Sequence, residues 1–286
     1  MFKQALTATA LLIALPVIAA TPIDERRGLA ADGRVEVSNL AGLIEVVGWD
    51  ENAVHLTGEL GEDVEALEIE GDRERLSIHV RYPKKSRRSV EETMLRLRVP
   101  HGAALDLNAV SADVRVVGTR GDLHAASVSG DVDVRFDGER LRLNSVSGDV
   151  SVQSAATDSE LRTVSGDVVA RGLRGELKAE TVSGDIDLIG EDFSDLAGET
   201  VSGDLQLSVR LLPKSRLRAE SLSGDVRLRL VDTGNVRLSM KTFSGSLRGR
   251  PSQPVSGDQR SAEYTLGAGT ARAELSTFSG DIVIER

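Results

Sequence analysis

The stretch LNSVSGDVSV at residues 143–152 decides the fold, because it recurs along the chain with few changes. AASVSGDVDV stands 18 residues before it, at 125–134, and LRTVSGDVVA stands 18 residues after it, at 161–170. A short unit repeated at a fixed period indicates a repeat architecture, in which each copy cannot bury its apolar face alone and packs on its neighbours.

The copies align on the serine of the Ser-Gly pair. These serines are Ser111, Ser129, Ser147, Ser165, Ser183, Ser202, Ser223, Ser244 and Ser279. A glycine follows in every copy but the first, at Gly130, Gly148, Gly166, Gly184, Gly203, Gly224, Gly245 and Gly280. An aspartate column comes next, at Asp113, Asp131, Asp149, Asp167, Asp185, Asp204 and Asp225, and again at Asp281 after the exception Ser246. An aliphatic residue follows each time, so the shared columns are those that a stacking contact needs.

Apolar and polar residues alternate on both sides of the Ser-Gly pair, which is typical of half-buried strands. Leu123 and Ala125 fall on one parity, whereas Val128, Val132 and Val134 fall on the other. A strand cannot change faces without a bulge or a corner, so the chain is predicted to bend within 127–131. Glycine supplies backbone freedom at such a corner, and the eight glycines of the column are therefore predicted to be structural turn residues.

Eighteen residues hold two short strands and two turns. Strands that repeat at this period, each adding one layer, predict an all-β fold: a parallel β-solenoid of about ten rungs. Stacking at ~4.8 Å per rung gives a rod on the order of 45 Å. Aromatic residues make up only 3% of the chain, which suits thin stacked layers. The competing interpretation is a β-sandwich with short strands.

Three segments are expected along the chain. Residues 1–20 have one charge, an apolar run and small residues at the end, which predicts a signal peptide cleaved near Ala20. Residues 21–104 are predicted to hold a first rung at 35–48, with Gly42 as the motif glycine, and an N-terminal antiparallel β cap. Residues 105–286 are predicted to be the solenoid, with a loop near 249–263, a hairpin turn at 267–269 and a final rung.

Charge and composition narrow the classes of function. The net charge of −10 argues against nucleic acid and anionic membrane surfaces as main partners. The sequence has no cysteine, and outside residues 1–20 no run could serve as a transmembrane anchor. The four histidines, His55, His79, His101 and His124, show no metal-ligand spacing, and the repeated serines lack the single nucleophile of a catalytic triad. We therefore expect no catalytic residues and no cofactor.

Two local features could bind a ligand. KKSRR, with Lys84, Lys85, Arg87 and Arg88, is the one basic cluster; it fits either a solvated hairpin tip or a docking point for an acidic polymer. Trp49 fits either packing in the cap or a platform on which a sugar ring stacks.

The aspartate column allows two interpretations. Carboxylates at ~4.8 Å repel one another by roughly 1 kcal/mol in water-like surroundings, so something must offset the repulsion. In the structural interpretation each carboxylate accepts backbone N–H bonds in its own turn. In the functional one the column from Asp113 to Asp225 holds a row of Ca²⁺ ions.

The segment GRVEVSNLAGLIEVVGWD at 33–50 and the serial VSGDV units ending in STFSGDIVI at 276–284 resemble the bacterial "putative adhesin" family of β-strand-repeat proteins, domain of unknown function 4097. The resemblance implies an exported protein of the periplasm or cell surface, without established catalytic residues. The prediction is thus an exported, non-catalytic β-solenoid that acts as an envelope scaffold or adhesin-like binding module for an envelope protein or a glycan. The alternatives are a Ca²⁺-binding solenoid and a polysaccharide-active β-helix enzyme.

Overall fold

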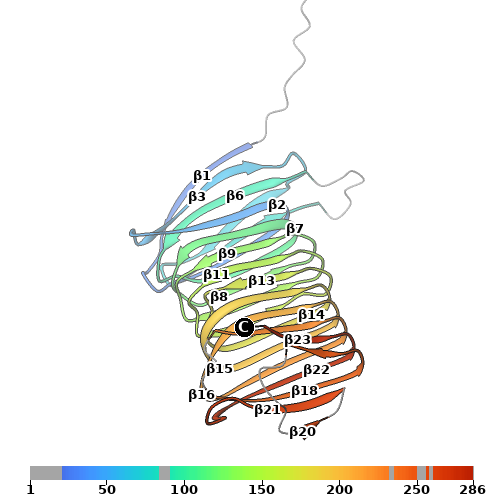
Figure 1. Ribbon diagram of the computed structural model, residues 1–286. Coiled ribbons are helices and arrows are strands. Elements are labelled where there is room, and N and C mark those ends of the chain that lie inside the picture. Colours follow the sequence, from blue (N-terminus) through green and yellow to red (C-terminus); the bar gives the residue numbers. More distant parts are fainter. Residues whose placement is uncertain (1–20, 84–90, 232–234, 250–255, 258–259, 286) are drawn as a thin grey trace, which may run out of the picture.

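The computed structural model describes residues 21–83, 91–231, 235–249, 256–257 and 260–285, and every regular element in them is a β-strand. Figure 1 shows the strands stacked side by side, with the N-terminal strands at one end of the stack and β20 and β21 at the other. Among the described residues no helix is long and apolar enough to span a membrane.

The central repeats stack as two parallel ladders. The first ladder contains β8 (Leu123–Ser127), β10 (Arg140–Ser145), β12 (Asp158–Arg162) and β14 (Gly175–Ser183). The second contains β9 (Val132–Phe136), β11 (Val150–Ser154) and β13 (Val168–Arg171). Leu141 lies opposite Leu123 on one side and Ser159 on the other, so partners are separated by one sequence period. The all-β, solenoid-like repeat is thereby confirmed, whereas the count of ten rungs stays a prediction.

Longer strands follow toward the C-terminus. β15 (Ile186–Ser202) and β16 (Leu205–Ser223) each join the second ladder of one rung to the first ladder of the next. The core between the ladders is a set of aliphatic columns, and Phe136 and Phe193 fill it near the variable connections. Alternating burial along each strand follows directly from the alternation in the sequence.

The glycines at the Ser-Gly corner are needed for a different reason from the one predicted. None of the eight has a positive φ, so freedom of the backbone dihedral is not what the corner uses. A Cβ at Gly148 would instead lie 2.1 Å from the carbonyl oxygen of Gly130 in the preceding rung. The glycine column therefore allows neighbouring backbones to approach closely. The buried hydroxyl of Ser145 stabilises the same corner by accepting the N–H of Gly148 at 3.0 Å.

The N-terminal part is built around β2 (Arg34–Trp49), which pairs in parallel with β7 (Ala104–Thr119). Gly42 lies opposite Ala112, as the alignment of the first rung requires. The further strands are β1 (Thr21–Gly28), β3 (Ala53–Leu60), β4 (Ala66–Gly71), β5 (Arg75–Arg81) and β6 (Thr93–Pro100).

The pairing of these strands is only partly antiparallel. The pairs β1–β3, β3–β6 and β4–β5 are antiparallel, as predicted for the cap. β5 and β6, however, pair in parallel with the two halves of β2. Outward from β2, the excursion therefore places a parallel layer of β5 and β6 first and the antiparallel strands β3 and β4 beyond it. The capping role of these strands stays a prediction.

The C-terminal strands do not stack in sequence order. They are β17 (Val226–Leu230), β18 (Val236–Ser244), β19 (Leu247–Arg248), β20 (Ser256–Gly257), β21 (Ser261–Thr265), β22 (Ala271–Ser279) and β23 (Ile282–Glu285). β22 lies between β16 and β18, and β23 lies between β17 and β19. The predicted final rung is thus inserted one place before the end.

The predicted hairpin turn at 267–269 is also wrong. β21 and β22 are not paired with each other, because β18 lies between them: antiparallel to β21 and parallel to β22. The turn crosses the start of β18, where the N–H of Val236 donates to Leu266 O and the N–H of Ala271 donates to Asn235 O. Within the predicted loop near 249–263, residues 256–257 pair with β21.

Candidate functional site

A column of exposed apolar side chains follows the fixed corner of the solenoid. Its members, in spatial order, are Val110, Val128, Val146, Val164, Val182, Val201, Leu222, Phe278 and Phe243, and their exposure runs from 42% to 62%. The prediction that Val128 shares a face with the buried Val132 and Val134 is therefore wrong. The corner turns two successive residues outward, Val128 and Ser129, and the alternation resumes one step later with Gly130.

Six members of this column, from Val164 to Phe243 in spatial order, form one wall of a groove of about 970 Å³ that runs across the strands. The opposite wall consists of Asn144, Arg162, Glu180, Glu199, Glu220, Ser276 and Lys241. Between the walls lies the hydroxyl column, whose side chains are buried. Thr181 Oγ1 donates to Gly166 O and Thr200 Oγ1 to Gly184 O, each at 3.3 Å. The floor hydroxyls are thus already engaged, and recognition falls to the two walls.

The apolar wall ends in an aromatic pair near the C-terminal end of the stack. The rings of Phe243 and Phe278 lie 4.7 Å apart between centroids, with an interplanar angle of 9°. Both rings are more than half exposed, which is unusual for large aromatic side chains without a partner surface.

The opposite wall is predominantly acidic at its centre. Glu180, Glu199 and Glu220 lie opposite one another on successive strands. Burial alone would raise the pKa of Glu180, but hydrogen bonds from Lys178 and Arg162 outweigh it and hold the pKa below its usual value. Among the described residues Glu199 forms no ion pair, so the centre of this wall presents an uncompensated carboxylate.

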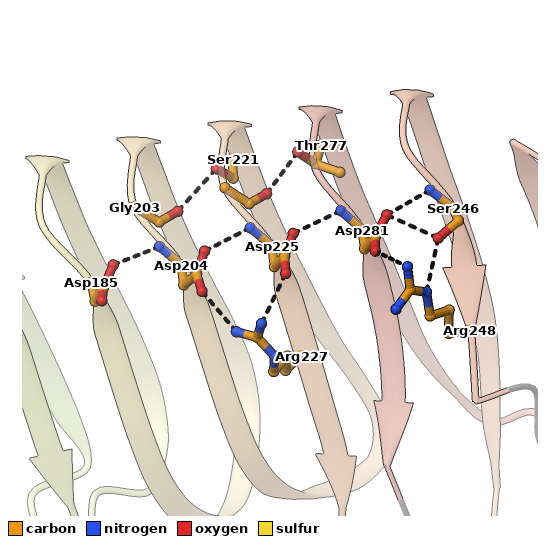
Figure 2. A network of polar contacts seen from close by, with 11 residues as sticks. Asp185, Gly203, Asp204, Ser221, Asp225, Arg227, Ser246, Arg248, Thr277 and Asp281 are labelled. Atoms are coloured by element: carbon orange, nitrogen blue, oxygen red, sulfur yellow. Dashed lines mark hydrogen bonds and ion pairs between the residues drawn. The ribbon is translucent and has the colours of Figure 1, made fainter.

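The aspartate column runs along the neighbouring edge as a ladder of hydrogen bonds (Figure 2). From Asp131 onward, each backbone N–H of the column donates to Oδ1 of the aspartate one rung before it, at 2.8 Å from Asp225 to Asp204 and at 2.9 Å from Asp281 to Asp225. The partner thus lies in the adjacent rung rather than in the same turn, which corrects the structural interpretation in detail. Arg227 adds ion pairs of 2.7 Å to Asp204 and 2.8 Å to Asp225.

These bonds explain how the stacked carboxylates of the column tolerate one another. One oxygen of each accepts a backbone N–H, which stabilises the charged form. The described part of the chain contains no group of three or more acidic or histidine side chains that could hold a metal ion. Binding of Ca²⁺ by this column remains an untested hypothesis.

The other candidates from the sequence lie apart from the groove. Trp49 is half-buried among the N-terminal strands, where its Nε1 donates to Ala53 O at 2.8 Å and its ring stacks on His55 at 6.2 Å. His101 Nδ1 lies 2.6 Å from Gly118 O. The KKSRR cluster at 84–88 and the predicted signal peptide at 1–20 fall outside the described residues.

Sequence reasoning missed the groove because it counted every apolar column as core. One signal could have revealed it: Phe243 and Phe278 occupy the same column as the valines. Two large rings in one column do not fit a thin interior built for valine and alanine, so an outward orientation is the better interpretation.

Most of the chain is similar to known proteins. The family model described as Toastrack DUF4097 matches residues 44–285. A "putative lipid binding protein" from Parabacteroides distasonis is 14% identical, covering 92% of this chain and 96% of that chain, with a TM-score of 0.49. A "putative adhesin" from Bacteroides fragilis is 12% identical, covering 93% and 98%, with a TM-score of 0.36. No curated protein matches the chain.

Proposed function

This chain belongs to the Toastrack DUF4097 family, and from that membership and the groove we propose that it is an exported, non-catalytic binding module that holds a partner of the cell envelope. The N-terminal antiparallel strands close one end of the module, and the partner binds along the side of the stack. An envelope scaffold and an adhesin differ in the partner, but both require this lateral surface.

One observation supports the proposal: the exposed apolar column holds only valine, leucine and phenylalanine, whereas the outward positions two residues earlier hold side chains of many kinds. The residues at those earlier positions include Asn144, Arg162, Glu180 and Lys241, which share neither charge nor size. In a repeat protein, outward positions that contact only solvent are free to differ in residue type from one repeat to the next. A contiguous exposed apolar row of this length is uncommon on monomeric soluble proteins and marks an interaction surface.

The walls define the chemistry of the occupant. The strands beneath the groove are paired on both sides, so their N–H and C=O groups cannot pair with an added strand. The occupant must therefore be recognised by side chains. One wall of the groove offers apolar side chains, and the other carries Glu180, Glu199 and Glu220. The matching partner is an extended polypeptide segment with apolar side chains along one side and lysine or arginine along the other.

Peptide binding tests this assignment. A labelled peptide that alternates leucine and lysine should bind saturably, and Phe278→Ser should weaken it about tenfold or more, because burial of a large side chain contributes ~1.5–3 kcal/mol. Val231→Ser is the matched control, since Val231 is an exposed apolar residue outside the groove. A leucine–glutamate peptide should bind far more weakly.

Three results would contradict the assigned occupant. These are equal binding of both peptides, saturable binding of palmitate or a neutral glycan instead, or dimerisation of the protein that Phe278→Ser abolishes. Export is tested separately by fractionating cells that express the full chain, where recovery in the cytoplasm alone contradicts it. Turnover of a glycan or ester substrate, abolished by one point substitution, would contradict the non-catalytic role.

A further inference from the structure

A second cavity, of about 340 Å³, lies at the opposite end of the strands that carry the aromatic pair. It is formed where β22 and β18 begin, beside residues 214–216 in the middle of β16. Its lining includes Lys214, Ser215, Arg216, Arg237 and Arg272, together with the turn at 269–271. Arg216 and Leu222 are six residues apart on β16, which is about 20 Å of strand. The cavity is therefore distinct from the groove, and the inference is independent of the proposed function.

Three arginines stack across this cavity on neighbouring strands. Arg272 lies opposite Arg216 on one side and opposite Arg237 on the other. All three are exposed, and within the described part of the chain none of them forms an ion pair. By register the nearest carboxylates are Asp195, opposite Arg216, Glu274, two residues after Arg272, and Glu263, opposite the residue two after Arg237; none of them forms an ion pair with these arginines. Three like charges thus share one column without an ion pair to any described carboxylate.

The stack differs from other outward arginines of the same ladder. Arg142 pairs with Asp158 at 2.8 Å, and Arg162 pairs with Glu180 at 2.6 Å. In those rungs a carboxylate on the same or the next strand compensates each guanidinium. The three arginines of the cavity form no such ion pair among the described residues, although the protein as a whole is acidic.

Two further features at the cavity are unusual: the backbone conformation of Lys214 and the environment of the Ser215 hydroxyl. Lys214 adopts a φ of 67°, a conformation that costs energy for a residue with a side chain and that is often found at binding sites. The next residue, Ser215, is 3% exposed, and its Oγ has no hydrogen-bond partner among the described residues. Ser215 has the buried parity of Leu217, so its hydroxyl lies beneath the exposed Lys214 and Arg216, and the three arginines remain the observation on which the site rests.

We propose that this cavity binds an oxyanion of the phosphate class. Guanidinium groups present planar pairs of N–H donors that match phosphate oxygens, and a doubly charged tetrahedral anion compensates several cations at once. Arg272, flanked by the other two arginines, is the central ligand, and Lys214 adds a mobile charge at the rim. The phosphate is carried either by a free ion or by the headgroup of an anionic lipid.

Titration of inorganic phosphate at constant ionic strength tests the site, with the melting temperature and calorimetric heat as readouts. Phosphate should bind saturably and raise the melting temperature, because a ligand of the folded state stabilises it. Arg272→Gln should raise the Kd about tenfold. Arg229→Gln is the matched control, since Arg229 faces outward on β17 away from the cavity and loses the same charge. Far-UV circular dichroism verifies that both variants fold.

Vesicles distinguish the two sources of phosphate. Sedimentation with phosphatidylglycerol vesicles, lost in Arg272→Gln and absent with phosphatidylcholine, identifies a lipid headgroup. Saturable phosphate binding without sedimentation identifies a free ion. The proposal is overturned if chloride at equal ionic strength produces the same stabilisation, or if Arg272→Gln and Arg229→Gln bind phosphate equally well.

Discussion

Replacement of Gly148 by alanine is the sharpest test of how the rungs fit together. The added Cβ would lie 2.1 Å from Gly130 O, whereas real Cβ atoms essentially never come closer than 3.0 Å. The two rungs must therefore separate locally by about 1 Å. The N–H of Ser147 donates to Val128 O at 2.8 Å, and the N–H of Asp149 donates to Asp131 Oδ1 at 3.0 Å. Both bonds would lengthen beyond useful range.

The expected cost follows from those two bonds. A neutral backbone bond contributes ~0.5–1.5 kcal/mol and a bond to a carboxylate ~1.5–3 kcal/mol, so Gly148→Ala should lower the free energy of unfolding by about 2–4 kcal/mol. Urea unfolding of the full chain, followed by far-UV circular dichroism, measures this loss.

Two controls separate the close approach from other effects. Ser147 is exposed, so Ser147→Ala should change stability by less than about 0.5 kcal/mol. Gly198 has a φ outside the left-handed region, and a Cβ there would meet nothing closer than 3.9 Å. Gly198→Ala should stabilise the protein by about 0.4–1 kcal/mol, because alanine restricts the unfolded chain. The reasoning is refuted if Gly148→Ala unfolds at the same urea concentration as Ser147→Ala, or if Gly198→Ala is as damaging as Gly148→Ala.

Three further outcomes are expected. Ser159 is buried in a leucine column, and its Oγ has no hydrogen-bond partner among the described residues, so Ser159→Ala should raise stability by about 1 kcal/mol in thermal melts; a loss would show that the hydroxyl is satisfied. Deletion of 141–158 keeps the register and should fold, whereas deletion of 141–149 should aggregate through an unpaired edge; size-exclusion chromatography and circular dichroism compare them. Hydrogen bonds from Ser246, backbone and side chain, lower the pKa of Asp281 below 3.8. This carboxylate therefore stabilises the fold above pH 3.8 and loses its effect as the pH falls through the lower folded-state pKa. The stability gap between the parent and Asp281→Asn, measured by urea unfolding, should close in that acid range, and a constant gap would contradict the assignment.

The sequence predicted the stacking register well, because parallel rungs require identical columns at equal offsets. The alignment of Gly42 with Ala112 across β2 and β7 came from pattern alone and is confirmed. The reason for the glycine column was not predictable in the same way. In the sequence, a glycine that is needed for a positive φ looks the same as a glycine that is needed because a neighbouring carbonyl comes close. Only the 2.1 Å approach in the structure distinguishes them.

The groove escaped prediction because the corner turns two successive residues outward. Val128 keeps the parity of the second strand's core residues, yet the chain has not completed its bend at that point. The order of the last rungs was hidden for another reason. Thr277 and Ser279 of β22 match the columns of both β16 and β18, so the insertion between them satisfies the repeat as well as sequence order would.

The insertion of β22 and β23 has a consequence for where a partner can bind. A parallel stack of matching rungs would recruit another copy at its end, because the outermost strand presents unpaired backbone groups. Here β22 and β23, the last strands of the chain, are paired on both sides. The terminal strands at this end are β18, which the short antiparallel β21 covers, and the two-residue β19, whose described pairing is to β23 alone. At the other end the outermost pairs, β1–β3 and β4–β5, are antiparallel as well, and β1 carries Asp24, Glu25, Arg26 and Arg27. Strands that change direction and carry charge discourage growth of the stack. We infer that these ends are poor templates for another copy of the chain, which favours the side of the solenoid, with its groove and its arginine cavity, as the surface for recognition.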